Sequence, residues 1–162
     1  MHPSAQKVAG AARALGLTVE IVEFDETTRT AQEAANAIGC QVAQIVKSLL
    51  FVVDGQPVMA LVSGANRLDE RKLAALRGAG RKKVERADAD MARAVTGFSI
   101  GGVPPFGHAS KLPVYVDEDL TRFDVVWAAA GTQFAVFPIK PADLVLITAG
   151  TVADLKATES NI

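Results

Sequence analysis

The segment FSIGGVPPFGH at 98–108 combines the residue types best suited to binding a ligand through the backbone. Its three glycines and two adjacent prolines exclude a regular helix or strand, because proline lacks a backbone donor and glycine costs conformational entropy. Gly101 and Gly102 allow backbone N–H groups to approach a ligand closely. Pro104 and Pro105 restrict the segment before a ligand binds. The segment is therefore either a shaped loop that binds an oxyanion or carbonyl group, or a rigid connection between a helix and a strand. We call it the Gly/Pro loop.

Lys47 stands at the start of an otherwise apolar run, with Leu49 and Phe51 on the same face of the expected strand. Its ammonium either binds a phosphate or ribose as a point charge, or extends from the strand end into solvent. Ser48 points to the opposite face by strand alternation. Lys47 is therefore a candidate site residue whose role depends on what the fold places beside it.

The sequence offers few side chains for acid–base or metal chemistry. Its two histidines, His2 and His108, cannot make a histidine-rich metal site. No G-x-S-x-G or cysteine signature supports a catalytic triad. His108 is either a general base or a structural cap of the Gly/Pro loop, and Cys40 is interpreted as a buried small hydrophobe. We expect neither a metal nor a cofactor.

A second interruption, AAAGTQF at 128–134, breaks an apolar strand pattern with Gly131 and Thr132. A simple turn is one interpretation of this segment. If the sheet brings the turn near the Gly/Pro loop, Gly131 and Thr132 would add backbone and hydroxyl donors to the same site.

Charge is balanced over the whole chain but not along it. The 162 residues carry a formal net charge of −1, which gives no global attraction to nucleic acid or a membrane surface. Residues 67–86, here called the basic segment, contain eight basic and three acidic side chains, a balance of +5 that leaves −6 elsewhere. The basic segment is either a solvated helix face and turn, or an edge that contacts phosphates through Arg81, Lys82 and Lys83.

Cysteine content and hydropathy bear on where the protein works. A single cysteine excludes an internal disulfide and fits a reducing compartment, so we expect a cytoplasmic protein. The start of the sequence lacks the pattern of a secretory signal, and no window approaches the roughly 20 apolar residues of a membrane span. We expect no membrane partner.

Hydrophobic periodicity and turn residues predict interleaved helices and strands. The clearest element is a hairpin over 46–64, in which Asp54-Gly55, a favoured two-residue turn, joins two apolar runs. Both faces of its first strand are apolar, so we expect that strand in the middle of a covered sheet. The other elements are helices at 4–15, 28–39, 69–78 and 88–97, strands at 18–24, 82–86, 113–116, 124–130 and 134–137, and a helix or last strand at 141–148.

A central hairpin among interleaved helices and strands excludes a purely parallel, doubly wound sheet. The sequence predicts an α+β fold, a mixed β-sheet with a central hairpin flanked by helices. No repeat, low-complexity tract or linker divides the chain, so we expect a single domain over 1–162.

Lys47 within VKSLLF, the GGVPPFGH motif at 101–108 and the order of elements around them resemble the YbaK/prolyl-tRNA synthetase-associated domain family. The resemblance runs from about Phe24 to Leu155 and includes the AAGTQF turn. Members of that family are freestanding or synthetase-inserted editing domains. The resemblance therefore implies a mixed sheet flanked by helices, hydrolysis of the ester that links a wrong amino acid to tRNA, and an aminoacyl-tRNA and a synthetase as partners.

Motif matching gives each candidate residue an implied role. Lys47, Gly101 and Gly102 would be catalytic, with Lys47 near the terminal adenosine and the Gly/Pro loop gripping the aminoacyl ester. The implied substrate-binding residues are Ser48, Val103, Pro104, Pro105, His108, Gly131 and Thr132. Members of the family that act on Cys-tRNA carry basic and acidic residues after the glycine that matches Gly131, where this chain has QFA at 133–135. This difference weakens the case that cysteine is the amino acid removed.

The leading hypothesis is a trans-editing hydrolase that deacylates a mischarged aminoacyl-tRNA bearing Ala, Cys, Ser or Thr by attack of water on the ester. An activated ester needs a positioned water and a stabilised oxyanion rather than a dedicated base. One alternative is a non-catalytic module that binds aminoacyl-adenosine or nucleic acid. Another is a sequence-independent DNA- or RNA-binding protein that uses the basic segment, although the near-neutral net charge argues against it.

Overall fold

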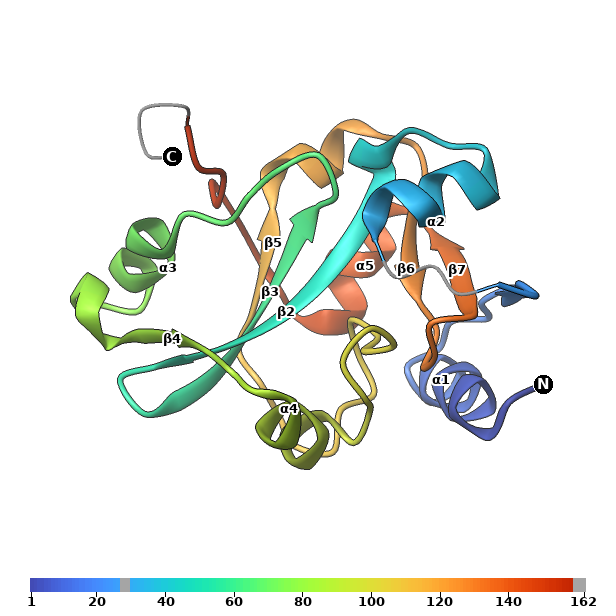
Figure 1. Cartoon of the computed structure of the whole chain (residues 1–162), viewed down its shortest axis with the longest axis horizontal. Coiled ribbons are helices and arrows are strands. Elements are labelled where there is room, and N and C mark those ends of the chain that lie inside the picture. The colour runs from blue at the N-terminus through green and yellow to red at the C-terminus, as the bar shows by residue number, and fades with distance from the viewer. Residues whose placement is uncertain (27–29, 159–162) are drawn as a thin grey trace.

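The computed structural model describes residues 1–26 and 30–158, which form one mixed sheet of eight strands and five α-helices (Figure 1). The strand order is β1-β7-β6-β2-β3-β5-β8, and β4 pairs with β2 outside this path. The predicted α+β fold with a central hairpin is therefore confirmed. The strands are β1 (Val22–Glu23), β2 (Ile45–Val53), β3 (Gln56–Ser63), β4 (Val84–Arg86), β5 (Val114–Asp117), β6 (Val126–Ala129), β7 (Ala135–Ile139) and β8 (Thr151–Ala153).

β2 and β3 form the central hairpin at the predicted place. Asp54 and Gly55 take positive φ values of 49° and 80°, the conformation that a two-residue turn between twisted strands requires. The antiparallel register runs from Val53 opposite Gln56 to Val46 opposite Ser63. The hairpin thereby provides the two longest strands of the sheet, and the sheet extends from it through β6 and β4 beside β2 and through β5 beside β3.

The helices begin where the sequence offers capping side chains. Thr30, Asp69 and Asp88 each accept a hydrogen bond from a backbone N–H group in the first turn of the following helix. These caps satisfy donors that have no partner within the helix. The helices are α1 (Pro3–Ala14), α2 (Ala31–Ile38), α3 (Glu70–Leu76), α4 (Ala89–Thr96) and α5 (Pro141–Thr148).

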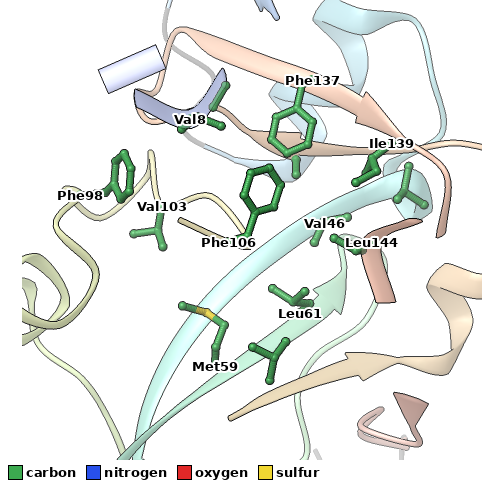
Figure 2. Packing of buried hydrophobic residues seen from close by; sticks show 14 of the residues in the cluster. Val8, Val46, Met59, Leu61, Phe98, Val103, Phe106, Phe137, Ile139 and Leu144 are labelled. Atoms are coloured by element: carbon green, nitrogen blue, oxygen red, sulfur yellow. The ribbon is translucent and has the colours of Figure 1, made fainter. Parts of the chain in front are cut away.

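The two faces of the hairpin bury separate apolar clusters. On the face of Val46, Met59 and Leu61, the larger cluster also contains residues of α1, α4, α5 and the Gly/Pro loop (Figure 2). The opposite face packs against α3, and α2 covers the start of β2. Phe106 of the Gly/Pro loop contacts Phe137 of β7 edge to face, with ring centroids 5.5 Å apart. Burying such a ring contributes about 1.5–3 kcal/mol, so the loop is anchored to the sheet at Phe106.

Several elements differ from the sequence-based expectation. The strand expected at 18–24 is limited to β1, because only Val22 and Glu23 form ladder pairs with β7, while the N–H of Phe24 still donates to the carbonyl of Phe134. The segment 141–148 is a helix, and the three-residue strand β8 that follows it is too short to show an alternating pattern. Residues 28 and 29 of the helix expected at 28–39 lie outside the described residues. Short 3₁₀ helices at Val42–Gln44, Arg81–Lys83 and Glu118–Arg122 were not predicted.

Two classes of feature are absent from the part of the chain that the structure describes. None of its helices is long and apolar enough to cross a membrane. Within the same ranges, no group of three or more His, Cys, Asp or Glu side chains is arranged to hold a metal ion.

Candidate active site

One edge of β2 is only partly paired. β3 pairs with the whole of the other edge, whereas on this edge β6 pairs with Ile45 and Val46 and β4 pairs with Phe51 to Val53. The two partners therefore leave a gap beside residues 47–49. A cavity of about 330 Å³ occupies this gap, a volume at the lower end of the range for small-molecule sites.

The cavity brings together segments that are far apart in the sequence. Lys47 and Ser48 of β2, Gly101 and Val103 of the Gly/Pro loop, and Thr132 of the β6–β7 turn all line it. Figure 1 shows the Gly/Pro loop, in yellow, beside α4 and below the open edge of β2. The other lining residues are Thr30, Ala31, Ala34, Ile45, Val46, Leu49, Leu50, Arg86, Ala87, Ala92, Ile100, Trp127, Ala128, Ala129, Ala135 and Val136.

Lys47 is half-buried, and its ammonium is held by the protein. Nζ donates a hydrogen bond to the backbone carbonyl of Asn66, in the connection after β3. Burial lowers the pKa of Lys47 below its ordinary value, the Asp117 carboxylate opposes that effect, and the Arg86 guanidinium adds to it. Lys47 thus lines the cavity, and its ammonium is anchored to Asn66, which is not one of the lining residues.

The ionisable groups of the cavity wall all carry positive charge. Lys47 and Arg86 line the cavity, while none of the described lining residues is an Asp, Glu, His or Cys. Thr30 and Ala31, at the amino end of α2, also line it, and a helix amino terminus carries a partial positive charge. The cavity therefore suits an anionic or strongly polar ligand, and none of the lining side chains that the structure describes can act as a carboxylate or imidazole base.

A family model for the aminoacyl-tRNA editing domain matches residues 25–147, which include every segment that lines this cavity. The chain belongs to the aminoacyl-tRNA editing domain family. The predicted family resemblance is therefore confirmed, and the match covers most of the span on which it was based.

This editing domain is similar to both freestanding proteins and synthetase segments. It is 46% identical to a solved protein described as a candidate trans-editing enzyme for prolyl tRNA synthetase, with a TM-score of 0.92 over 98% of this chain and 99% of that one. It is 32% identical to the uncharacterized protein YwhH of Bacillus subtilis over 77% of this chain and 78% of that protein. It is 37% identical to the proline--tRNA ligase of Citrifermentans bemidjiense over 57% of this chain, but that match spans 16% of the ligase.

Ser48 of the editing domain presents both its backbone and its side chain at the gap. Because Val53 and Gln56 close the two-residue turn, the even-numbered residues of β2 direct their N–H and C=O groups away from β3. Leu50 follows this pattern, since its carbonyl accepts from the N–H of Ala87 at 3.0 Å. The Ser48 Oγ atom is buried without a hydrogen-bond partner among the described residues.

Gly101 and Gly102 have different roles in the loop. Gly101 is exposed, lines the cavity and has a φ of 95°. Gly102 is buried and does not line the cavity, and its N–H donates to the carbonyl of Ser99 at 3.0 Å. Gly131 likewise lies outside the cavity wall, and its N–H donates to the carbonyl of Gly102 at 2.9 Å. Both of these N–H groups are therefore already used within the protein.

Pro104, Pro105 and His108 lie away from the cavity that contains Lys47. Both prolines are buried, and Pro105 and His108 line a second, more open hollow beside α1 and the end of α5. His108 Nε2 is 2.7 Å from the carbonyl oxygen of Pro104, and burial lowers the pKa of the imidazole. This geometry fits a role of His108 as a structural cap of the Gly/Pro loop better than a role as a general base in the cavity.

The basic segment approaches the site from the side. β4 continues from the 3₁₀ helix Arg81–Lys83 to Arg86, which lies opposite Phe51 and lines the cavity. At about 3.3 Å per strand residue, Lys83 lies roughly 10 Å along the chain from Arg86. Arg81, Lys82 and Lys83 are exposed, and Arg81 pairs with Glu70 at 2.5 Å.

Sequence reasoning missed several residues of the cavity wall. Arg86 was counted in the basic segment but not assigned to the site, and Trp127, Ile100 and Thr30 were not singled out. Trp127 is the only tryptophan and directly precedes the interrupted strand pattern at 128–134, which could have drawn attention to it. The other two carry no signal in a single sequence.

Proposed function

We propose that this editing domain is an aminoacyl-tRNA deacylase, which hydrolyses the ester between a wrong amino acid and the terminal adenosine of a tRNA. The observation that carries the proposal is that Lys47 and Gly101, from segments more than fifty residues apart in the sequence, line one cavity. Family membership supports the same reaction class, since the matched model describes aminoacyl-tRNA editing. We infer that the reaction takes place in the cytoplasm.

In the proposed reaction, water attacks the ester carbonyl carbon and the bond from that carbon to the ribose oxygen breaks. The proton from water ends on the ribose hydroxyl, so the products are a free amino acid and an uncharged tRNA. Negative charge develops on the carbonyl oxygen, and preorganised N–H donors stabilise it. Because the N–H of Gly102 is bonded to Ser99, the N–H groups of Gly101 and Val103 are the loop donors that we assign to this oxyanion.

Lys47 and Arg86 supply the positive charge that the nucleic-acid end of the substrate needs. A point charge such as the Lys47 ammonium binds phosphate or a ribose hydroxyl, and the Arg86 guanidinium can bind a phosphate with two parallel hydrogen bonds. From Arg86 the exposed side chains of Arg81, Lys82 and Lys83 continue outward, where the acceptor stem would lie. The net charge of the chain stays near zero, so this attraction is local.

The amino acid is a small one in this proposal. Alanine side chains of α2, α4, β6 and β7 make up much of the cavity wall, which leaves room for an Ala, Ser, Cys or Thr side chain beside the ribose. A synthetase pocket rejects a residue that differs by one methylene by only about 1–3 kcal/mol, so a second site is needed to remove the errors. This chain is similar to segments of proline--tRNA ligases, which makes that synthetase our candidate partner and the tRNA for proline our candidate substrate.

The direct test is to incubate the purified protein with a panel of tRNAs for proline carrying Ala, Ser, Cys, Thr or Pro, and to measure free amino acid. We expect hydrolysis of at least one small, wrong ester and none of the Pro ester. Saturable binding without release of amino acid, at protein in excess over tRNA, would instead support the non-catalytic binding module. Binding to any duplex with equal affinity would support the sequence-independent nucleic-acid-binding alternative.

A further inference from the structure

A fully buried carboxylate lies behind the cavity. Asp117, the last residue of β5, has an exposed fraction of 0%. It accepts hydrogen bonds from the backbone N–H groups of Ser63, at 3.0 Å, and Asp119, at 2.9 Å. No Lys or Arg among the described residues forms an ion pair with it. A buried charge is costly unless it is compensated, so its retention calls for a physical reason.

Asn66 connects this carboxylate to the cavity. Its Nδ2 atom donates to Asp117 Oδ2 at 2.9 Å and to Asp119 Oδ2 at 2.8 Å, which uses both protons of the amide. Its backbone N–H donates to the carbonyl of Ser63 at 2.9 Å. Asn66 is therefore held through both its side chain and its backbone N–H. Its backbone carbonyl oxygen is the group that accepts from Lys47 Nζ.

We propose that Asp117 is a positioning residue, which through Asn66 holds the ammonium of Lys47, a residue of the cavity wall, in place. The importance of Lys47 rests on the proposed function, but the link between the three residues does not. Without the amide bonded to Asp117 and Asp119, the carbonyl of Asn66 would lose its fixed position. Without the charge of Asp117, the cost of burying the ammonium would lose the electrostatic attraction that partly offsets it.

The charged groups around Lys47 make this link testable. Asp117 at the end of β5 and Arg86 on β4 act on the ammonium in opposite directions, and Asp119 reaches it only through the amide of Asn66. Asp119 is in turn paired with Arg122 at 3.2 Å and with Lys156 at 4.0 Å, so its charge is compensated elsewhere. Removing the charge of Asp117 therefore changes the environment of Lys47 in one predictable direction.

The experiment measures the protonation of Lys47 by NMR of the side-chain ¹³Cε and ¹⁵Nζ atoms in lysine-labelled protein, without tRNA. In Asp117→Asn we expect the pKa of Lys47 to fall, and the high-pH limit of deacylation to move to lower pH. The matched control is Asp154→Asn, which removes an exposed partner of Lys72 and should leave Lys47 unchanged. A Lys47 pKa that is unchanged in folded Asp117→Asn would overturn the proposal, even if that variant were less stable.

Asn66→Ala serves as a second variant in case Asp117→Asn does not fold. It keeps the buried carboxylate and its two backbone donors but removes the amide that fixes the carbonyl. We expect deacylation to slow roughly 10- to 100-fold through misplacement of the ammonium, with Asn66→Asp failing to rescue it because it lacks the NH₂ donor. Deacylation by Asn66→Ala at the wild-type rate would count against the proposal. If wild-type protein hydrolyses no ester, the proposed function fails, while the NMR measurement still decides this one.

Discussion

Gly131 donates its backbone N–H to the carbonyl of Gly102 at 2.9 Å, which joins the β6–β7 turn to the Gly/Pro loop. The two segments approach so closely that a Cβ atom at Gly102 would lie 2.6 Å from the Gly131 carbonyl oxygen. A Cβ atom at Gly131 would lie 2.6 Å from the carbonyl oxygen of Ser4 on α1. These glycines therefore position the loop by close packing, whereas Gly101 is the one of the three that lines the cavity.

Alanine at Gly102 or Gly131 should consequently destabilise the protein and displace Gly101 from the cavity wall. We expect a loss of about 1–3 kcal/mol in the free energy of unfolding, as for other overpacked sites, together with a loss of deacylation. Chemical denaturation and single-turnover assays measure the two effects. Gly80→Ala is the control, because nothing lies within 4 Å of a Cβ atom there. Wild-type stability in both glycine variants would contradict the packing role.

The pH dependence of stability should report His108. Burial lowers the pKa of the folded imidazole, so the unfolded chain binds a proton first as the pH falls. The contribution of His108 to the free energy of unfolding is therefore present above about pH 6.5, the ordinary pKa of histidine, and is lost as the pH falls below it. Denaturant unfolding between pH 5 and 8 should show a smaller pH dependence in His108→Gln than in wild type. An identical slope in His108→Gln and in the wild type would refute this account.

Ser48→Ala should raise stability and lower activity at the same time. Removing a buried hydroxyl without a partner relieves a desolvation cost, so we expect a gain of about 1 kcal/mol in the free energy of unfolding. Because Ser48 lines the cavity, we expect its hydroxyl to bind the substrate, so that its loss slows deacylation. Ser63→Ala is the matched control and should lose stability, since that hydroxyl donates to the Ala43 carbonyl at 2.7 Å. Destabilisation by Ser48→Ala would show that its hydroxyl is satisfied in the free protein.

Neutralising Arg81, Lys82 and Lys83 together should weaken tRNA binding without changing the cleavage of a minimal substrate. Each lost phosphate contact makes the negative slope of log affinity against log salt concentration shallower by about 0.7–0.9. We expect the triple glutamine variant to show a higher KM for tRNA and a shallower salt dependence, with unchanged hydrolysis of an aminoacyl-adenosine. Lys140→Gln, at the start of α5 and outside the basic segment, provides the control. An unchanged salt slope would place the acceptor stem elsewhere.

The local parts of the fold and site were predictable because their signals are local. Asp54-Gly55 between two apolar runs is sufficient for the hairpin, and the density of glycine and proline around Gly101 is sufficient for an irregular loop. The family motifs then connected Lys47 with Gly101, and both line the same cavity.

The cavity itself could not be predicted, because it depends on long-range pairing. β4 and β6 both pair with one edge of β2 and leave residues 47–49 open between them, which no local pattern encodes. His108 and Pro105 follow Gly101 closely in the sequence, which suggested a shared site. The loop, however, turns into the core near Phe106, so that Gly101 and Val103 line the cavity whereas Pro105 to His108 line the second hollow.

The most direct test of the proposed active site is the single-turnover rate at which Lys47→Ala releases amino acid from the mischarged tRNA that the wild-type protein hydrolyses best. The control is Lys140→Ala, which removes a lysine that does not line the cavity. If the cavity beside the open edge of β2 is where the ester is cut, Lys47→Ala should be slower by roughly 100-fold, a loss that misplacement of the bound ester can cause, while Lys140→Ala keeps the wild-type rate. Equal rates for the two variants would contradict the assignment of this cavity as the active site.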